Sequence, residues 1–187
     1  MTPDLLVVAC NTLSTLVLPE FRRRWSFPIV GVVPAIKPAA QMSSNKVVGL
    51  LATPATVGRS YTKKLVDQFA RDCEFIAFGS TFLVELAERK LAGEAVCLNQ
   101  LSREVAPLFS KEVRPDTVVL GCTHFPLLKR ELERVYPEVT FVDSGASIAA
   151  RVAYILGTTD VYGHCGVAYL TEQSSSSDLI DNLKSDD

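Results

Sequence analysis

The sequence predicts an α/β fold in which mainly parallel strands are covered by helices. The chain has 187 residues, 48% of them hydrophobic and 21% charged, so it can bury a sizeable core. Short apolar runs rich in β-branched residues alternate with segments of helical periodicity. Strands that are apolar throughout are typical of a parallel sheet with both faces buried.

Six segments have the composition of buried strands. We expect them at 5–9, 29–33, 46–52, 74–78, 117–120 and 140–142. Helical patterns are clearest at 56–71, 81–92 and 126–136. Proline in a helix interior removes a hydrogen bond, so we expect the helical stretch after Thr12 to restart or kink at Pro19.

Composition argues against several classes of partner and compartment. Nineteen basic against 21 acidic residues give a net charge of −2, which disfavours nucleic acid or an anionic membrane as a partner. The N-terminus does not have the pattern of a signal peptide, and no apolar stretch reaches the roughly 18 residues of a membrane span. The odd number of cysteines and the lack of a CxxC pair disfavour a disulfide framework or a zinc ribbon. We therefore expect a reduced, cytoplasmic protein.

Two stretches of the chain repeat one pattern. "LLVVACNT" and "TVVLGCTH" each read as an apolar strand, a small residue, a cysteine and a polar residue ahead of a helix. Ligands of open α/β sheets bind at the carboxyl ends of the strands. The repeat predicts two similar lobes, which offer Cys10 and Cys122 to one site.

The residues beside each cysteine suit a polar ligand. A thiol ahead of a helix start lies near free amides and the positive end of the helix dipole, so we expect Cys122 to favour the thiolate. His124 can bind a ligand or influence the protonation of that thiol. Asn11 and Thr12 can bind a small polar ligand, although both also suit a helix cap. The alternative is that Cys122 is a small core residue and His124 a surface histidine.

Two thiols on opposite sides of a carbon can remove a proton from one face and return one to the other. A cysteine hydrolase or acyl transferase could also use a Cys-His pair, but it leaves the second cysteine without a role. A thiol redox function needs the two sulfurs within disulfide distance, which a substrate-sized gap prevents.

Several motifs together resemble the glutamate racemases of the aspartate/glutamate racemase superfamily. They are "VVACNT", "GVVPAIKPA", "GLLATPATV", "LVELAE", "VVLGCTHFPLL" and "VDSGASIA". The resemblance runs from about residue 4 to about residue 156. It implies two pseudo-symmetric lobes and interconversion of L- and D-glutamate without a cofactor or metal, which supplies D-glutamate for peptidoglycan. Many members are homodimers, and some are regulated by a peptidoglycan precursor.

The resemblance also implies residue roles. Cys10 matches the base for the α-proton of D-glutamate, and Cys122 matches the base for L-glutamate. His124 matches a residue that assists Cys122. Glu85 matches an acidic residue near the site, although it could also be an exposed charge on a helix face. The amino and carboxylate groups of glutamate are held by the polar residues of both cysteine motifs and by two pocket threonines: Asn11, Thr12, Thr123, His124, Thr53 and Thr56. Thr56 is equally suited to capping a helix.

The chain departs from the family pattern at its start. Members carry about sixty residues ahead of the first cysteine motif, with an Asp-Ser-Gly turn and a tyrosine-containing substrate loop. The one "DSG" here, Asp143–Gly145, matches a later family motif. We therefore expect an incomplete first lobe at 1–34 plus 144–172, a second lobe at 35–143 and a disordered tail at 173–187. We also expect this chain to be weakly active, inactive or poorly folded.

Other readings stay open from the sequence. The substrate could be another amino acid such as aspartate, or the chain could be a non-catalytic remnant that binds glutamate or a partner. Cys73 and Cys97 are expected to be packing residues. His164 and Cys165 are adjacent, but no further ligand is recognisable, so we expect no metal site.

Overall fold

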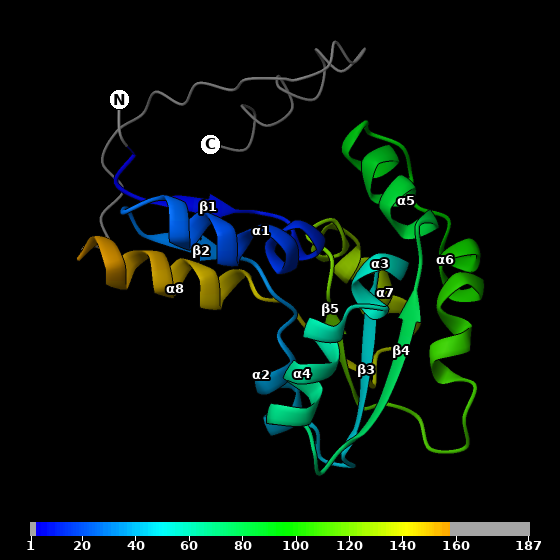
Figure 1. Ribbon diagram of the computed structural model, residues 1–187. Coiled ribbons are helices and arrows are strands. Elements are labelled where there is room, and N and C mark those ends of the chain that lie inside the picture. Colours follow the sequence, from blue (N-terminus) through cyan, green and yellow to red (C-terminus); the bar gives the residue numbers. More distant parts are fainter. Residues whose placement is uncertain (1–2, 158–187) are drawn as a thin grey trace.

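Two separate parallel sheets organise residues 3–157, the part of the chain that the computed structural model describes (Figure 1). The smaller sheet pairs β1 (Leu6–Val8) with β2 (Ile29–Gly31). The larger sheet has the order β4-β3-β5-β6, formed by β3 (Val47–Ala52), β4 (Glu74–Gly79), β5 (Thr117–Leu120) and β6 (Thr140–Val142). Every neighbouring pair is parallel, which confirms the predicted α/β class.

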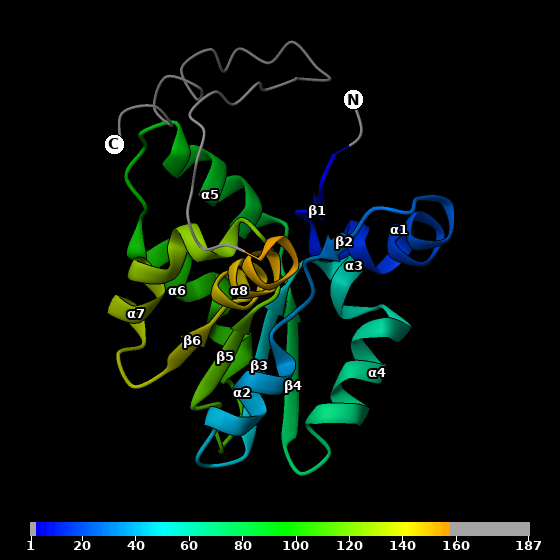
Figure 2. The same ribbon diagram turned by 90° about the vertical axis from the view of Figure 1, so that its left-hand side faces the viewer.

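Helices connect the strands and cover both sheets. In chain order they are α1 (Asn11–Arg24), α2 (Ile36–Met42), α3 (Pro54–Val57), α4 (Ser60–Phe69), α5 (Phe82–Leu91), α6 (Leu98–Val105), the 3-10 helix η1 (Ala106–Phe109), the 3-10 helix η2 (Phe125–Leu128), α7 (Lys129–Val135) and α8 (Gly145–Leu156). On the larger sheet, α2 and α4 lie against one face, and α5, α6 and α7 lie against the other (Figures 1 and 2). Helices α1 and α8 lie on opposite sides of the smaller sheet.

The core of the larger sheet has two sides because β3 is buried along its whole length. Leu51 points into the larger cluster beneath α5 and α6, while Leu50 points into the cluster beneath α2. Successive strand residues face opposite sides of a sheet, so a strand covered on both faces needs an apolar residue at every position. This burial explains why β3 reads in the sequence as an uninterrupted apolar run.

The smaller sheet is held by α1. Val8, Leu18 and Ile29 form its buried cluster. A Cβ on Gly31 would clash with Leu18 Cδ1, so the helix approaches the strand closely only because this residue is glycine. The buried Ser14 hydroxyl donates to the Val8 carbonyl at 3.0 Å and accepts from the amide of Val32, which follows β2, at 3.1 Å.

Two helix predictions need correction. Helix α1 continues through Pro19, so the expected restart is wrong, while the alternative of a kink there stays a prediction; the turn that follows still packs through Phe21 on the smaller sheet. The predicted helix 56–71 is divided into α3 and α4. Gly58 ends α3, and Arg59 is extended (φ −75°, ψ 136°) before α4 begins. The Thr62 hydroxyl donates to the Thr56 carbonyl at 2.7 Å and so satisfies a group at the break.

The predicted helix at 126–136 begins as the 3-10 turn η2 and becomes α-helical only at Lys129. Helices α2, α6 and α8 were not predicted. The predicted tail at 173–187, and residues 158–172 of the predicted first lobe, lie outside the described part. No helix within residues 3–157 has the length and apolar character needed to span a membrane.

Candidate active site

Cys10 lies between the carboxyl end of β1 and the start of α1. Its backbone is extended (φ −152°, ψ 121°), and its sulfur accepts a hydrogen bond from the Leu13 amide at 3.4 Å. The thiol thus caps α1, a role usually played by a hydroxyl, amide or carboxylate. Asn11 and Thr12 follow as the first helical residues, at the edge of the smaller sheet where the sequence predicted a ligand.

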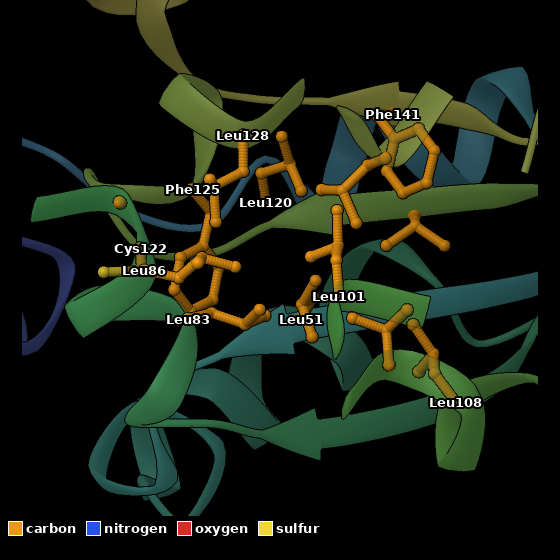
Figure 3. Close-up of a cluster of buried hydrophobic side chains, with 14 of the residues drawn as sticks. Leu51, Leu83, Leu86, Leu101, Leu108, Leu120, Cys122, Phe125, Leu128 and Phe141 are labelled. Carbon is orange, nitrogen blue, oxygen red and sulfur yellow. The ribbon is translucent and has the colours of Figure 1, made fainter. Parts of the chain in front are cut away.

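Cys122 lies after β5, separated from the strand by Gly121. It is 8% exposed and belongs to the core cluster of the larger sheet. Figure 3 shows its side chain at the edge of that cluster, next to Leu86 and Phe125. The same residue therefore closes the hydrophobic core and faces the end of the sheet where the two cysteine motifs meet.

The environment of Cys122 favours its protonated thiol. Burial raises the pKa of Cys122 above its usual value, and the nearby Cys10 raises it further. Three backbone amides act in the opposite direction but are outweighed: those of His124, Phe125 and Thr123. The amides at the helix start therefore act in the predicted direction, but burial outweighs them, so the prediction that Cys122 favours the thiolate is wrong.

His124 joins Cys122 to a carboxylate. Its Nδ1 lies 3.8 Å from the Cys122 sulfur, and its Nε2 lies 2.5 Å from Oε1 of Glu88 on α5. An ionised carboxylate only accepts hydrogen bonds, so the neutral tautomer that satisfies Glu88 is the one with its proton on Nε2, and this tautomer presents Nδ1 to the thiol as an acceptor. The three side chains form a line from the core to the surface, and proton transfer along it is geometrically possible.

The acidic residue in contact with the site is Glu88, which was not predicted. The predicted residue, Glu85, is exposed on α5, and its side chain has no hydrogen bond or ion pair within residues 3–157. Both belong to "FLVELAERK", one helical turn apart. The sequence signal was a pair of acidic residues at this spacing, but choosing between them requires knowing which turn of α5 lies over His124.

Three predicted binding residues meet each other. The Thr12 hydroxyl lies 3.2 Å from that of Thr53 and 2.8 Å from that of Thr56, and the last two are 3.1 Å apart. Thr53 also caps α3. This hydroxyl triangle joins the start of α1, beside the smaller sheet, to the turn that follows β3 in the larger one. It does not line the cavity described next.

A cavity of about 380 Å³ lies between the carboxyl ends of β1 and β5 and the start of α8. Cys10 itself is not part of the lining. Both cysteine motifs and the segment where α8 begins contribute residues to it: Asn11, Cys122, Thr123, Asp143, Ser144 and Gly145. The last three were not predicted as site residues, although the "DSG" motif marked them. Asp143 Oδ1 accepts from the Gly145 amide at 2.8 Å, which shapes the loop.

Asn11 marks where a ligand donor would fit. It is 3% exposed, lines the cavity, and its Oδ1 has no hydrogen-bond partner among the residues that the structure describes. An unsatisfied buried acceptor costs about 1–3 kcal/mol, and native proteins leave few such atoms. An N–H donor of a bound ligand would satisfy it.

Within the described residues no three histidine, cysteine or acidic side chains gather as they would around a metal ion. Cys73 and Cys97 are free thiols, and Cys97 is exposed rather than packed in the core. His164 and Cys165 lie outside this part.

Comparison with known proteins identifies the family to which this chain belongs. The model of the family described as Asp/Glu/Hydantoin racemase matches residues 2–152. Glutamate racemase of Pectobacterium atrosepticum is 56% identical over 157 residues, which are 83% of this chain and 55% of that protein. Glutamate racemase of Klebsiella pneumoniae is 58% identical over 153 residues, 81% of this chain and 54% of that protein. The chain thus spans about half the length of these curated relatives.

A solved structure supports the same family assignment. Escherichia coli glutamate racemase, in complex with L-glutamate and the activator UDP-MurNAc-Ala, superposes with a TM-score of 0.88 at 47% identity. The match covers 97% of this chain and 70% of that one. The chain belongs to the Asp/Glu/Hydantoin racemase family and, within it, groups with the glutamate racemases.

Proposed function

We propose that this site interconverts L- and D-glutamate by a two-base reaction without a cofactor. The observation that carries the proposal is the convergence of two thiols, each at the carboxyl end of a strand from a different sheet. They are close enough for Cys10 to raise the pKa of Cys122. Family membership, and the L-glutamate bound in the Escherichia coli relative, support glutamate as the substrate.

In the reaction, Cys122 acts on L-glutamate. Burial keeps its thiol protonated, so its proton first passes from sulfur to Nδ1 of His124, and Glu88 stabilises the resulting imidazolium. The thiolate then takes the α-proton, and the neutral Cys10 thiol gives a proton to the opposite face of the carbanion. For D-glutamate the cysteines exchange roles.

Substrate binding is proposed for the polar residues near the thiols. The free Oδ1 of Asn11 suits the ammonium group of glutamate. Thr123 lines the same cavity and supplies a hydroxyl to a carboxylate. Thr12, Thr53 and Thr56 stay predictions as substrate residues, since in this structure they bond to one another.

Exchange of the α-proton with deuterium from solvent tests the proposal for each enantiomer separately. We expect exchange in the wild-type chain and none in Cys10→Ser or Cys122→Ser. Glu88→Gln should slow exchange from L-glutamate, whereas Glu85→Gln, one turn away, should leave it unchanged. Exchange with aspartate in place of glutamate would indicate the other racemase. Glutamate binding without exchange would indicate a non-catalytic remnant, and either result would overturn the proposal.

A groove of about 490 Å³ lies between β2 and α8 and is lined by Arg22 and Arg151, which suggests a binding site for a second ligand. We propose that their guanidinium groups hold the diphosphate of a nucleotide-sugar such as UDP-MurNAc-Ala, the activator bound in the Escherichia coli relative. Calorimetric titration with UDP-MurNAc-Ala tests this. Arg22→Met and Arg151→Met should each weaken binding, while Arg23→Met, which removes an exposed ion pair with Glu20, should not.

We also propose that the two sheets belong to two lobes with the boundaries expected from the sequence, 1–34 with 144–172 and 35–143. Dimer formation and a cytoplasmic location stay predictions. Sedimentation velocity over a range of protein concentrations would decide between monomer and dimer.

A further inference from the structure

Helix α5 must be held in one place for Glu88 to meet His124. The Glu88 side chain is 48% exposed, so its own surroundings do not fix it. The buried apolar residues of α5 in the core cluster are Leu83, Leu86 and Ala87, and Phe82 and Val84 pack against it. Apolar contact is not directional, so it resists separation of α5 from the core more than a shift of α5 along its axis. A polar contact is needed to set the position of the carboxylate.

Lys90, two residues after Glu88, makes such a contact. Its ammonium group donates to the Leu127 carbonyl at 2.6 Å and lies 2.8 Å from both carboxylate oxygens of Glu131. Leu127 belongs to η2, which begins directly after His124, and Glu131 belongs to α7. Lys90 therefore ties the end of α5 to the segment that carries His124.

The surroundings of this contact differ from those of a surface ion pair. The Lys90 and Glu131 side chains are 31% and 16% exposed. The neighbouring pair Arg89–Glu94 is 51% exposed on both sides and joins α5 only to the loop that follows it. Exposed pairs contribute little to stability, whereas a half-buried ammonium with three acceptors defines a geometry.

We propose that Lys90, through Glu131 and the Leu127 carbonyl, is a positioning residue that sets the Glu88–His124 contact and thereby the orientation of the imidazole toward Cys122. The role of Lys90 in catalysis rests on the proposed function. Lys90 does not touch the reacting atoms. Lys90 acts by fixing the position of α5 over η2. Replacing Lys90 should therefore change the environment of His124, although Lys90 itself does not contact the His124 ring.

The nuclear magnetic resonance spectrum of the histidine rings tests this without requiring activity. The sequence has two histidines, His124 and His164, so His164→Gln leaves one set of ring signals to assign. The nitrogen chemical shifts report which ring nitrogen carries the proton. Glu88→Gln defines the shifts of a ring that has lost its carboxylate partner.

In the full chain, Lys90→Met and Glu131→Gln should both move the His124 nitrogen shifts most of the way toward those of Glu88→Gln. Lys90→Arg should restore them, and the matched control Arg89→Met should leave them in place. Circular dichroism identifies any variant that fails to fold. Unchanged His124 shifts in folded Lys90→Met and Glu131→Gln would overturn the proposal, as would an equal shift in Arg89→Met.

An activity measurement then separates the two proposals. Misplacement of catalytic groups by about 1 Å can cost up to about a hundredfold in rate. We therefore expect Lys90→Met to slow α-proton exchange from L-glutamate by about tenfold or more at an unchanged KM. If wild-type chain exchanges no proton, the proposed function fails, and the ring shifts still decide the role of Lys90.

Discussion

Gly121 separates β5 from Cys122, and alanine at this position tests how tightly the core sets the thiol. A Cβ there would lie 2.7 Å from Leu50 Cδ1 and 3.1 Å from the Ala52 side chain. Leu50 and Ala52 are fully buried, so neither can turn away into solvent. Forcing one methyl group into a filled core costs about 1–3 kcal/mol. We expect Gly121→Ala to lower the free energy of unfolding by that amount.

Urea unfolding followed by circular dichroism measures this loss. With a slope of about 2 kcal/mol per M, a loss of about 2 kcal/mol lowers the midpoint by about 1 M. Gly58→Ala is the matched control, because a Cβ there meets only the Pro54 carbonyl oxygen at the ordinary distance of 3.5 Å. It should stabilise the chain slightly by restricting the unfolded state. A Gly121→Ala midpoint equal to wild type, at an unchanged slope, would refute the reasoning.

Two further predictions concern a buried thiol in the larger sheet's core and a buried hydroxyl at the smaller sheet. The pKa of Cys122 is raised in the native state, so in alkaline solution the native state keeps a proton that the unfolded state loses. The stability that this thiol contributes should therefore be complete below the ordinary thiol pKa of 9.0. It should fall as the pH rises through that value. Unfolding measured from neutral to alkaline pH should show a steeper loss in wild type and in Cys97→Ala than in Cys122→Ala, and parallel curves would contradict this. Ser14→Ala leaves the Val8 carbonyl and the Val32 amide without their partner, so it should cost about 1–3 kcal/mol in the same assay, and a variant as stable as wild type would contradict the bond geometry.

The strands were predictable because burial on both faces leaves a direct trace in composition. The predicted strand 140–142 coincides with β6, and 46–52 differs from β3 by one residue. Helix ends were harder, because tertiary contacts decide them. The break after α3 depends on the Thr62 hydroxyl reaching the Thr56 carbonyl, and α2 contains Pro38, which hides its helical pattern.

The site was predictable as far as its repeated motif reached. The cysteines could be placed because each follows an apolar strand. Glu88 could not be chosen over Glu85, because the choice depends on how α5 is seated over η2. The sign of the Cys122 pKa shift was also out of reach, since nearby amides are visible in a sequence but the degree of burial is not.

The burial of Cys122 has a practical consequence for thiol-directed reagents. Among the four cysteines in the described part of the chain, Cys97 is exposed, whereas Cys122 is buried and holds its proton more tightly than usual. Electrophiles react with the thiolate, so both access and ionisation favour modification elsewhere first. The stoichiometry of labelling by a general reagent is therefore a poor measure of the site. A selective covalent inhibitor would need to be small enough for the cavity and to bind there before it reacts.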